Sequence, residues 1–385
     1  MRRLFSGNKE RYLSGKRILP KGIKKEDSVS QVIENSMLAY NGGRIRAACI
    51  QLKTKFSKED VTVGISLAGA LTPAGLGPSC IIPLIKHGFI DWIVATGANM
   101  YHDIHFAFNM PIYQGSHLVD DKELRRVGVV RVYDILFDYD GVLMKTDHIL
   151  RKILTRPEFQ MEMGTQEFYY KLGKVMDQFE KENNVHDVSI LAAAYRHGVP
   201  VFTSSPGDST IGMNIAGLEI LSDKFKLRIN PSTDVNESTA IVLDAKKSGG
   251  KSGVILVGGG SPKNFMLQTE PQIQEVLMIP EVGQDYFLQI TDARPDTGGL
   301  SGATPSEAVS WGKVDPEQLD DTVIVYSDTT IVLPLITSYV LQNTKPKTHK
   351  RLYDKREELV KKLREAYFEN NDEIKMLKEM LDGSS

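Results

Sequence analysis

The chain contains six short runs of apolar and β-branched residues, and each run is followed by glycine, serine or aspartate. Segments with helical periodicity separate the runs, which begin at Val61, Asp91, Val199, Gly253, Tyr286 and Thr322. Strands that are apolar on both faces and alternate with helices are typical of a parallel sheet covered on both sides. The sequence therefore predicts an α/β fold with a doubly wound, mostly parallel sheet.

Composition excludes several functional classes. The 385 residues are 41% hydrophobic, which suffices for one large domain or two of medium size. A formal net charge of −2 gives no overall field that would favour nucleic acid or an anionic membrane. The N-terminus turns polar too early for a secretory signal, and the longest apolar run is shorter than the ~20 residues of a membrane helix.

Only two cysteines occur, Cys49 and Cys80, and neither belongs to a CxxC motif. We therefore expect a cytoplasmic protein in which both are inert core thiols. We also expect three parts: an N-terminal helical segment (1–55), a catalytic domain (56–342) and a C-terminal helical extension (343–385). The extension places Leu359, Leu363 and Tyr367 on one side of a helix, which should pack on the body or on a neighbouring subunit.

Ligands of such sheets bind beyond the carboxyl ends of the strands. The glycines 258–260 follow a strand there, so their backbone N–H groups can cradle a phosphate. The same glycines also suit a tight turn, and they lack the GxGxxG spacing. Asp328 can accept hydrogen bonds from a ribose, or it can cap the helix that begins near Thr329. The residues alone leave both pairs of readings open.

Two motifs resemble metal sites. His102 and His105 are three residues apart, and no second cluster offers the remaining ligands. The run Phe137-Asp-Tyr-Asp-Gly141 is similar to the start of a calcium loop but lacks the glutamate that an EF-hand carries at its twelfth position. We expect no metal.

Lys313 follows Trp311 and Gly312 in a run that otherwise suits a half-buried core. One reading is a surface lysine whose alkyl stem covers the indole. The other is a desolvated lysine with a lowered pKa, whose neutral amine can form an imine. The segment alone does not decide between them.

Read together, these segments resemble deoxyhypusine synthase over about residues 60–341. The likeness is densest at 258–260, 298–313 and 327–328, and the run Glu307-Ala-Val-Ser-Trp-Gly-Lys313 is highly specific to that family. The segment 350–357 is similar to bacterial deoxyhypusine synthase-like proteins. The resemblance implies a Rossmann-like fold, a homotetramer, and Lys313 as the nucleophile.

The resemblance also implies an NAD-dependent aminobutyl transferase of polyamine metabolism. In that family NAD+ takes a hydride from spermidine, and a lysine receives the aminobutyl unit as an imine while 1,3-diaminopropane leaves. An acceptor amine then takes the unit, and the NADH reduces the product. The acceptor is either a small amine or a protein lysine. Alternatives are a catalytically silent NAD-binding homologue and, third, an ordinary NAD dehydrogenase.

By the same resemblance, the NAD contacts fall on Ala70, Leu71, Thr72, Pro73, Ala74, Thr96, Gly97, Ala98, His102, Asp208, Gly259, Asp292, Ala293, Asp328 and Thr329. The amine-pocket contacts fall on Tyr101, Met213, Asn264, Gly298, Gly299, Leu300, Glu307 and Trp311, beside the catalytic Lys313. Eukaryotic members have acids where this chain has His102, Met213 and Leu300, and a histidine where it has Asn264. Fewer carboxylates leave the exact amine open.

Overall fold

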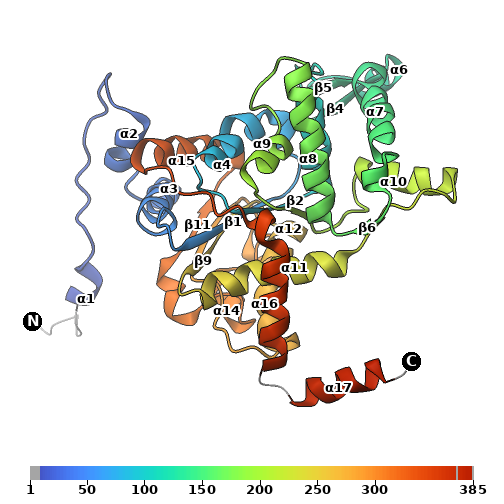
Figure 1. Cartoon of the computed structure of the whole chain (residues 1–385). Helices are drawn as coiled ribbons and strands as arrows, with labels where there is room; N and C mark the ends of the chain where they lie inside the picture. Colours follow the sequence, from blue (N-terminus) through green and yellow to red (C-terminus); the bar gives the residue numbers. More distant parts are fainter. Residues whose placement is uncertain (1–8, 370–371, 384–385) are drawn as a thin grey trace, which may run out of the picture.

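The computed structural model describes residues 9–369 and 372–383. Six parallel strands form its central sheet in the order β11-β10-β9-β1-β2-β7 (Figure 1). The strands are β1 (Val61–Leu67), β2 (Trp92–Ala95), β7 (Val201–Thr203), β9 (Lys251–Val257), β10 (Tyr286–Thr291) and β11 (Thr322–Tyr326). Each lies in one of the six apolar runs, and the predicted doubly wound α/β sheet is confirmed.

Helices cover both faces of this sheet, and a hydrophobic core fills each interface. The first core includes residues of α2 (Val29–Ser36), α3 (Tyr40–Gln51), α4 (Ile82–Lys86), α5 (Gly97–Ala107), α7 (Lys145–Leu154), α8 (Thr165–Glu182), α9 (Ile190–His197), α10 (Thr210–Leu221) and α15 (Thr329–Asn343). The second includes residues of α11 (Pro231–Lys247), α12 (Gly260–Leu267), α14 (Pro305–Ser310) and α16 (Arg356–Glu369).

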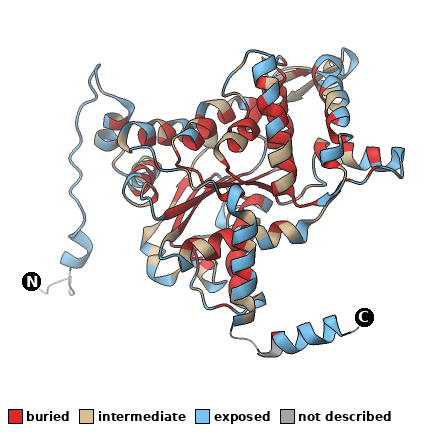
Figure 2. Ribbon diagram, viewed as in Figure 1, coloured by how far each residue is buried: buried red, intermediate tan, exposed pale blue. Residues whose placement is uncertain are grey.

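Strand β9 shows why the apolar runs are continuous. Its Val254 and Leu256 pack in the second core, whereas Ile255 and Val257 pack in the first. Since successive side chains of a strand point to opposite faces, a strand buried on both sides has no polar face. The buried strands lie at the centre of the molecule (Figure 2).

Smaller elements surround this body. An antiparallel sheet has the order β3 (Tyr113–Gln114), β5 (Ile135–Asp138) and β4 (Val129–Val132), and β6 (Glu162–Met163) pairs with β8 (Arg228–Ile229). The other helices are α1 (Glu10–Leu13), α6 (Asp121–Arg126), α13 (Thr269–Pro271) and α17 (Asp372–Asp382). Within the described residues, no helix is both long and apolar enough to cross a membrane. Both cysteines are buried and free, as expected of core thiols.

The C-terminal extension packs on the body, which is one of the two expected arrangements. Its first part crosses the start of the central strand, where buried Lys347 donates Nζ hydrogen bonds to the carbonyl oxygens of Val61 (3.0 Å) and Phe56 (3.3 Å). Helix α16 then lies along α11 (Figure 1), with Leu359 and Leu363 buried in the second core. The extension therefore completes the core.

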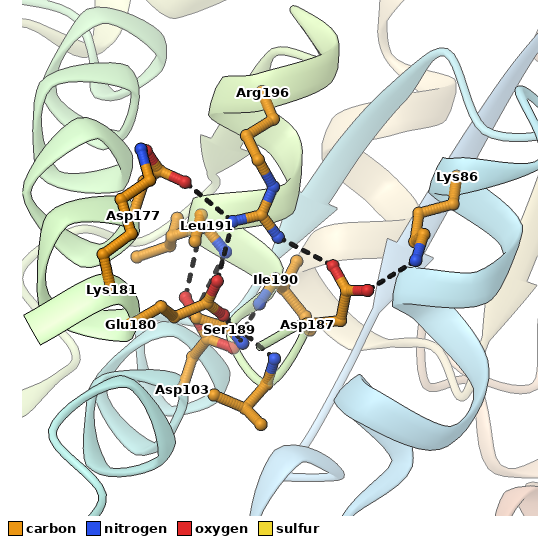
Figure 3. A network of polar contacts seen from close by, with 12 residues as sticks. Lys86, Asp103, Asp177, Glu180, Lys181, Asp187, Ser189, Ile190, Leu191 and Arg196 are labelled. Carbon is orange, nitrogen blue, oxygen red and sulfur yellow. Dashed lines mark hydrogen bonds and ion pairs between the residues drawn. The ribbon is translucent and has the colours of Figure 1, made fainter. Parts of the chain in front are cut away.

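A buried polar network joins α5, α8 and α9 (Figure 3). The carboxylate of Asp103 on α5 accepts hydrogen bonds from Ser189 Oγ (2.6 Å) and from the backbone N–H of Ile190 (2.6 Å). Arg196 on α9 donates to Glu180 (2.7 Å), and it also binds Asp177 and Asp187. The network fixes α5, whose first turn lies at the carboxyl end of β2.

Candidate active site

Residues predicted to contact NAD follow all six central strands at their carboxyl ends. They are Ala70–Ala74 after β1, Thr96–Ala98 and His102 after β2, Asp208 after β7, Gly259 after β9, Asp292 and Ala293 after β10, and Asp328 and Thr329 after β11. Because the strands are parallel, these ends lie along one edge of the sheet. The fold thus brings the predicted NAD contacts to a common edge.

A residue that sequence analysis missed, Asn99, joins two of these loops. It is fully buried, and its Oδ1 accepts hydrogen bonds from the backbone N–H of Leu71 (2.8 Å) and Thr72 (3.2 Å). Its Nδ2 donates to the carbonyl oxygen of Gly69 (3.2 Å), which also accepts from Thr96 Oγ1 (2.6 Å). This amide therefore shapes the loop after β1 and holds it against the first turn of α5.

The glycine turn after β9 has a backbone that other residues rarely adopt. Gly258 and Gly260 have φ angles of 78° and 58°, in the left-handed region. A Cβ on Gly259 would lie 2.3 Å from Cα of Ser301, whereas no atom lies within 4 Å of the Cβ position of Gly260. The tight-turn reading is confirmed, and the open space beside Gly260 is also what a phosphate cradle needs.

Asp328 caps helix α15. Its Oδ1 accepts a hydrogen bond from the backbone N–H of Thr330 (2.7 Å), so the structural reading of this aspartate is confirmed. The cap occupies one carboxylate oxygen and fixes the side chain at the edge where the strands end.

A cavity of about 320 Å³ contains Lys313. Its lining is formed by Lys263, Asn264, Leu267, Gln268, Leu300, Ala303, Glu307, Ala308, Trp311 and Lys313. Lys313 is half-buried; its Nζ donates to Oδ1 of Asn264 (3.1 Å) and lies 5.7 Å from the ring centroid of Trp311. The cavity thus holds the predicted lysine, carboxylate and indole together.

Burial lowers the pKa of Lys313 below its usual value, and the carboxylates of Glu307 and Glu275 act in the opposite direction. A low-dielectric surrounding disfavours the ammonium, so it increases the fraction of neutral amine. The nucleophilic reading requires such a partly desolvated amine, although the neighbouring residue Trp311 is 58% exposed.

Other predicted amine contacts lie outside this cavity. Tyr101 is buried, and its hydroxyl donates to Oδ1 of Asp147 (2.8 Å) on α7. Met213 lies on α10 with 68% of its surface exposed. Gly298 and Gly299 belong to the loop that reaches the cavity at Leu300 but do not line it. Of the predicted amine contacts, the cavity gathers Asn264, Leu300, Glu307 and Trp311.

The two metal-like motifs have structural roles. His102 and His105 pack in an aromatic cluster with Tyr101 and Phe137. Burial lowers the pKa of His102 to about 4, which keeps its imidazole neutral at pH 7. Asp138 accepts hydrogen bonds from the backbone N–H groups that follow it. Across residues 9–369 and 372–383, no group of three or more metal-binding side chains gathers.

Lys263 is a second lysine of the cavity that sequence analysis did not assign. Only 3% of it is exposed, and its Nζ donates to Oε1 of Gln289 (3.0 Å) and to the carbonyl oxygen of Ala303 (2.7 Å). A signal was available, because Lys263 lies in the first turn of α12, where the helix dipole disfavours a cation.

Comparisons with known proteins identify the family. A sequence model of the family "DS: Deoxyhypusine synthase" matches residues 31–340. A deoxyhypusine synthase-like protein of Nostoc punctiforme is 53% identical over 353 residues, which cover 92% of this chain and 90% of that protein. "Probable deoxyhypusine synthase 2" of Methanosarcina acetivorans is 38% identical over 327 residues, with 83% and 88% coverage.

A solved structure shares the fold. The crystal structure of a candidate deoxyhypusine synthase from Entamoeba histolytica aligns with a TM-score of 0.52, covering 86% of this chain and all of that one, at 14% sequence identity. At that identity the alignment supports the architecture alone.

Proposed function

The chain belongs to the deoxyhypusine synthase family, and from this premise we propose that it is an NAD-dependent aminobutyl transferase of polyamine metabolism. It would move a 4-aminobutyl unit from spermidine or a related amine, through an imine on Lys313, to an acceptor amine. The observation that carries the proposal is the half-buried amine of Lys313 inside a cavity that also contains Glu307 and Trp311.

The cavity supports each step that falls to this chain's own residues. Partial desolvation favours the neutral amine of Lys313, which is the form that attacks an electrophilic carbon. The carboxylate of Glu307 can pair with an ammonium of the substrate, and the indole of Trp311 offers a face for a cation. Asn264 accepts a hydrogen bond from Lys313, which orients the amine.

The strand ends suit NAD. The residues that would hold it are the loop after β1, the first turn of α5, the glycines after β9, and the carboxylates of Asp292 and Asp328. The open space beside Gly260 and the buried support from Asn99 fit a cofactor that approaches backbone closely. When bound, NAD would accept a hydride from the donor amine and return it to the product.

The acceptor that we propose is a small diamine. Among the described residues that line the cavity, Glu307 is the one carboxylate, so the lining suits a substrate with few ammonium groups. Leu300 and Trp311 at the cavity are 49% and 58% exposed, which leaves a path for a small molecule. A protein lysine is the alternative acceptor, and its product would be a modified protein.

Trapping the imine tests the proposal. The protein is incubated with NAD+ and spermidine, reduced with borohydride and digested. Mass spectrometry then measures the mass of the peptide that contains Lys313. A butylamine adduct on Lys313, absent from the Lys313→Ala variant, is expected. Bound NAD without an adduct from any of a panel of polyamines would favour the silent homologue. Accumulating NADH without released diaminopropane would favour a dehydrogenase.

A further inference from the structure

Lys313 lies just beyond the end of a short helix. Helix α14 stops at Ser310, and Gly312 follows with a φ of 65°, in the left-handed region that suits glycine. The backbone N–H of Gly312 donates to the carbonyl oxygen of Val309 (3.0 Å), and that of Lys313 donates to the carbonyl oxygen of Ala308 (3.0 Å). These two bonds form a Schellman motif, so Lys313 is the second residue beyond the helix cap.

A side chain from outside this helix holds the turn. The Nε2 group of Gln274 donates a hydrogen bond to the carbonyl oxygen of Gly312 (2.7 Å). A Cβ on Gly312 would collide with Oε1 of the same amide, so the amide packs closely against bare backbone. Because a carbonyl oxygen only accepts hydrogen bonds, the nitrogen of the Gln274 amide must face Gly312. The residue before Lys313 is therefore fixed both by its own helix and by Gln274.

Backbone contacts hold Lys313 itself. Its carbonyl oxygen accepts a hydrogen bond from the backbone N–H of Gln284 (3.1 Å), and the backbone N–H of Asp315 donates to the carbonyl oxygen of Gln284 (3.2 Å). These groups belong to the main chain, so a change of side chain does not delete them. A substitution at position 274 therefore loosens the turn at Gly312 while the backbone bonds of Lys313 can remain.

Gln274 is itself held by a π-helical turn and a buried acid. The turn, Gln272–Val276, is closed by a hydrogen bond from the backbone N–H of Leu277 to the carbonyl oxygen of Gln272 (2.9 Å). Such turns are frequent at functional sites. Nε2 of Gln274 also donates to Oε2 of Glu270 (3.3 Å), a fully buried residue of α13. Burial raises the pKa of Glu270 to about 8, so this support is mostly uncharged at pH 7.

The position of the turn matters because a lysine side chain is long. A flexible alkyl stem separates Cα from Nζ, so the amine can be no better placed than the backbone that carries it. At its far end, Nζ of Lys313 donates to Oδ1 of Asn264 (3.1 Å) on α12. A shift of about 1 Å in a reacting group can cost about 100-fold in rate. A loose turn at Gly312 should therefore slow the attack of Lys313.

We propose that Gln274 is a positioning residue of this site, whose side-chain amide holds the turn at Gly312 and thereby aims the amine of Lys313 into the cavity. The inference rests on the proposed role of Lys313 as the nucleophile. Gln274 lies outside the described lining of the cavity, so it acts through the backbone of Lys313. Burial, Glu307 and Glu275 act on the pKa of that amine, whereas Gln274 acts on its place.

Reductive alkylation measures the reactivity of Lys313 without NAD or a polyamine. The whole protein is treated with butanal and cyanoborohydride, and mass spectrometry follows the alkylated peptide that contains Lys313, with peptides of exposed lysines as internal references. The aldehyde carbon and Nζ form an imine with loss of water, and cyanoborohydride reduces it to a secondary amine. The Gln274→Met variant keeps the size of the side chain but loses the amide, so we expect labelling of Lys313 to slow about tenfold.

Gln284→Met is the matched control. Gln284 is fully buried, and its side-chain oxygen accepts a hydrogen bond from Ser252 Oγ on β9 instead of facing Gly312. Its backbone N–H, which contacts Lys313, is kept in the variant. We expect the thermal unfolding temperature to fall at least as far as in Gln274→Met, with the labelling rate of Lys313 unchanged.

A third variant separates the hydrogen bond from the shape of the side chain. In Gln274→Glu the new carboxyl group can donate to the carbonyl oxygen of Gly312 only while it is protonated. Partial burial beside Glu270 should raise the pKa of this group. Labelling of Lys313 should therefore be within about twofold of the wild type at pH 6 and about tenfold slower than the wild type at pH 9. A role in overall stability alone would not produce this pH profile in folded protein.

Two results would overturn the inference. One is labelling of Lys313 at the wild-type rate in folded Gln274→Met protein. The other is an equal slowing in Gln284→Met, which would make the effect one of general stability. If Gln274→Met does not fold, Gln274→Glu at the two pH values replaces it, and a rate ratio that does not change with pH overturns the inference.

The labelling also separates this inference from the proposed function. Butanal needs neither NAD nor a polyamine to react with Lys313. Labelling that depends on Gln274, together with a failed imine trap with spermidine, would count against the transferase and not against the positioning role.

Discussion

The Lys313 cavity and the network around Arg196 both remove charged side chains from water, and they do so in opposite ways. In the network, Arg196 binds the carboxylates of Asp177, Glu180 and Asp187, so opposite charges meet (Figure 3). In the cavity, Lys263 and Lys313 hydrogen-bond only to neutral oxygens among the contacts described above. Ion pairs join the helices of the network, whereas in the cavity burial lowers the pKa of both lysines.

Removing Lys313 should separate activity from stability most sharply. The Lys313→Ala variant loses the group that carries the aminobutyl unit, so we expect transfer to fall by at least ~10³-fold. Calorimetry should find NAD affinity within about twofold of the wild type, and thermal unfolding should change little. Retained turnover in this variant would contradict the assignment of the nucleophile.

Removing Arg196 should instead lower stability and leave activity unchanged. The Arg196→Ala variant leaves the carboxylate of Glu180, only 2% exposed, without its cation, whereas Asp177 keeps its ion pair with Lys181. Breaking such a buried pair costs about 3 kcal/mol. Urea unfolding measures this loss, while turnover per folded molecule should stay unchanged.

Lys86→Ala is the matched control for that prediction. Lys86 forms an ion pair with Asp187, and both side chains are well exposed, so its removal should cost less than about 1 kcal/mol. An equal loss in the two variants would mean that burial does not set the strength of this network.

The pH dependence of the free energy of unfolding should reveal the lowered pKa of the buried Lys263. Its folded pKa, about 8, lies below the unfolded value near 10.4, so the unfolded chain binds more protons between these values. The contribution of Lys263 to the free energy of unfolding therefore rises with pH across that window, by about 3 kcal/mol. The difference between wild-type and Lys263→Met protein in urea unfolding at pH 7.5, 9 and 10.5 should follow this rise.

Neutralising the cavity carboxylate should have a moderate effect on substrate binding. The Glu307→Gln variant keeps the shape but loses the charge that pairs with a substrate ammonium, so we expect KM for the amine to rise about tenfold. Steady-state kinetics over a range of amine concentrations measures it. A fall in kcat with unchanged KM would instead place Glu307 in the chemical step.

Sequence alone was sufficient for the central sheet. The strands are buried on both faces, so each one appears in the sequence as a continuous apolar run. All six strands were predicted from these runs. A helix cap could also be predicted from the sequence, since Asp328 directly precedes its helix. Lys313 became recognisable through the specific run from Glu307 onward.

The buried residues that hold the loops of the site in place could not be predicted from the sequence. Asn99, Lys263 and Gln289 act through hydrogen bonds to residues between 12 and 40 positions away in the chain, and no local pattern encodes such pairs. Gln289 did leave a trace, as a lone polar residue in an apolar strand. The predicted contacts Tyr101 and Met213 lie outside the cavity because tertiary packing orients α5 and α10.

The hydrogen bond from Lys347 to Val61 has a consequence for biosynthesis. The two residues are 286 positions apart, so a ribosome adding ~5–20 residues per second needs roughly 15 to 60 s between them. During that time β1 cannot yet form its hydrogen bonds with β9 or, later still, with the C-terminal segment. Nascent chains can pair β1 with β2 early, but the other edge of β1 stays open until β9 is made, and chaperones that bind exposed strand edges have their longest opportunity there.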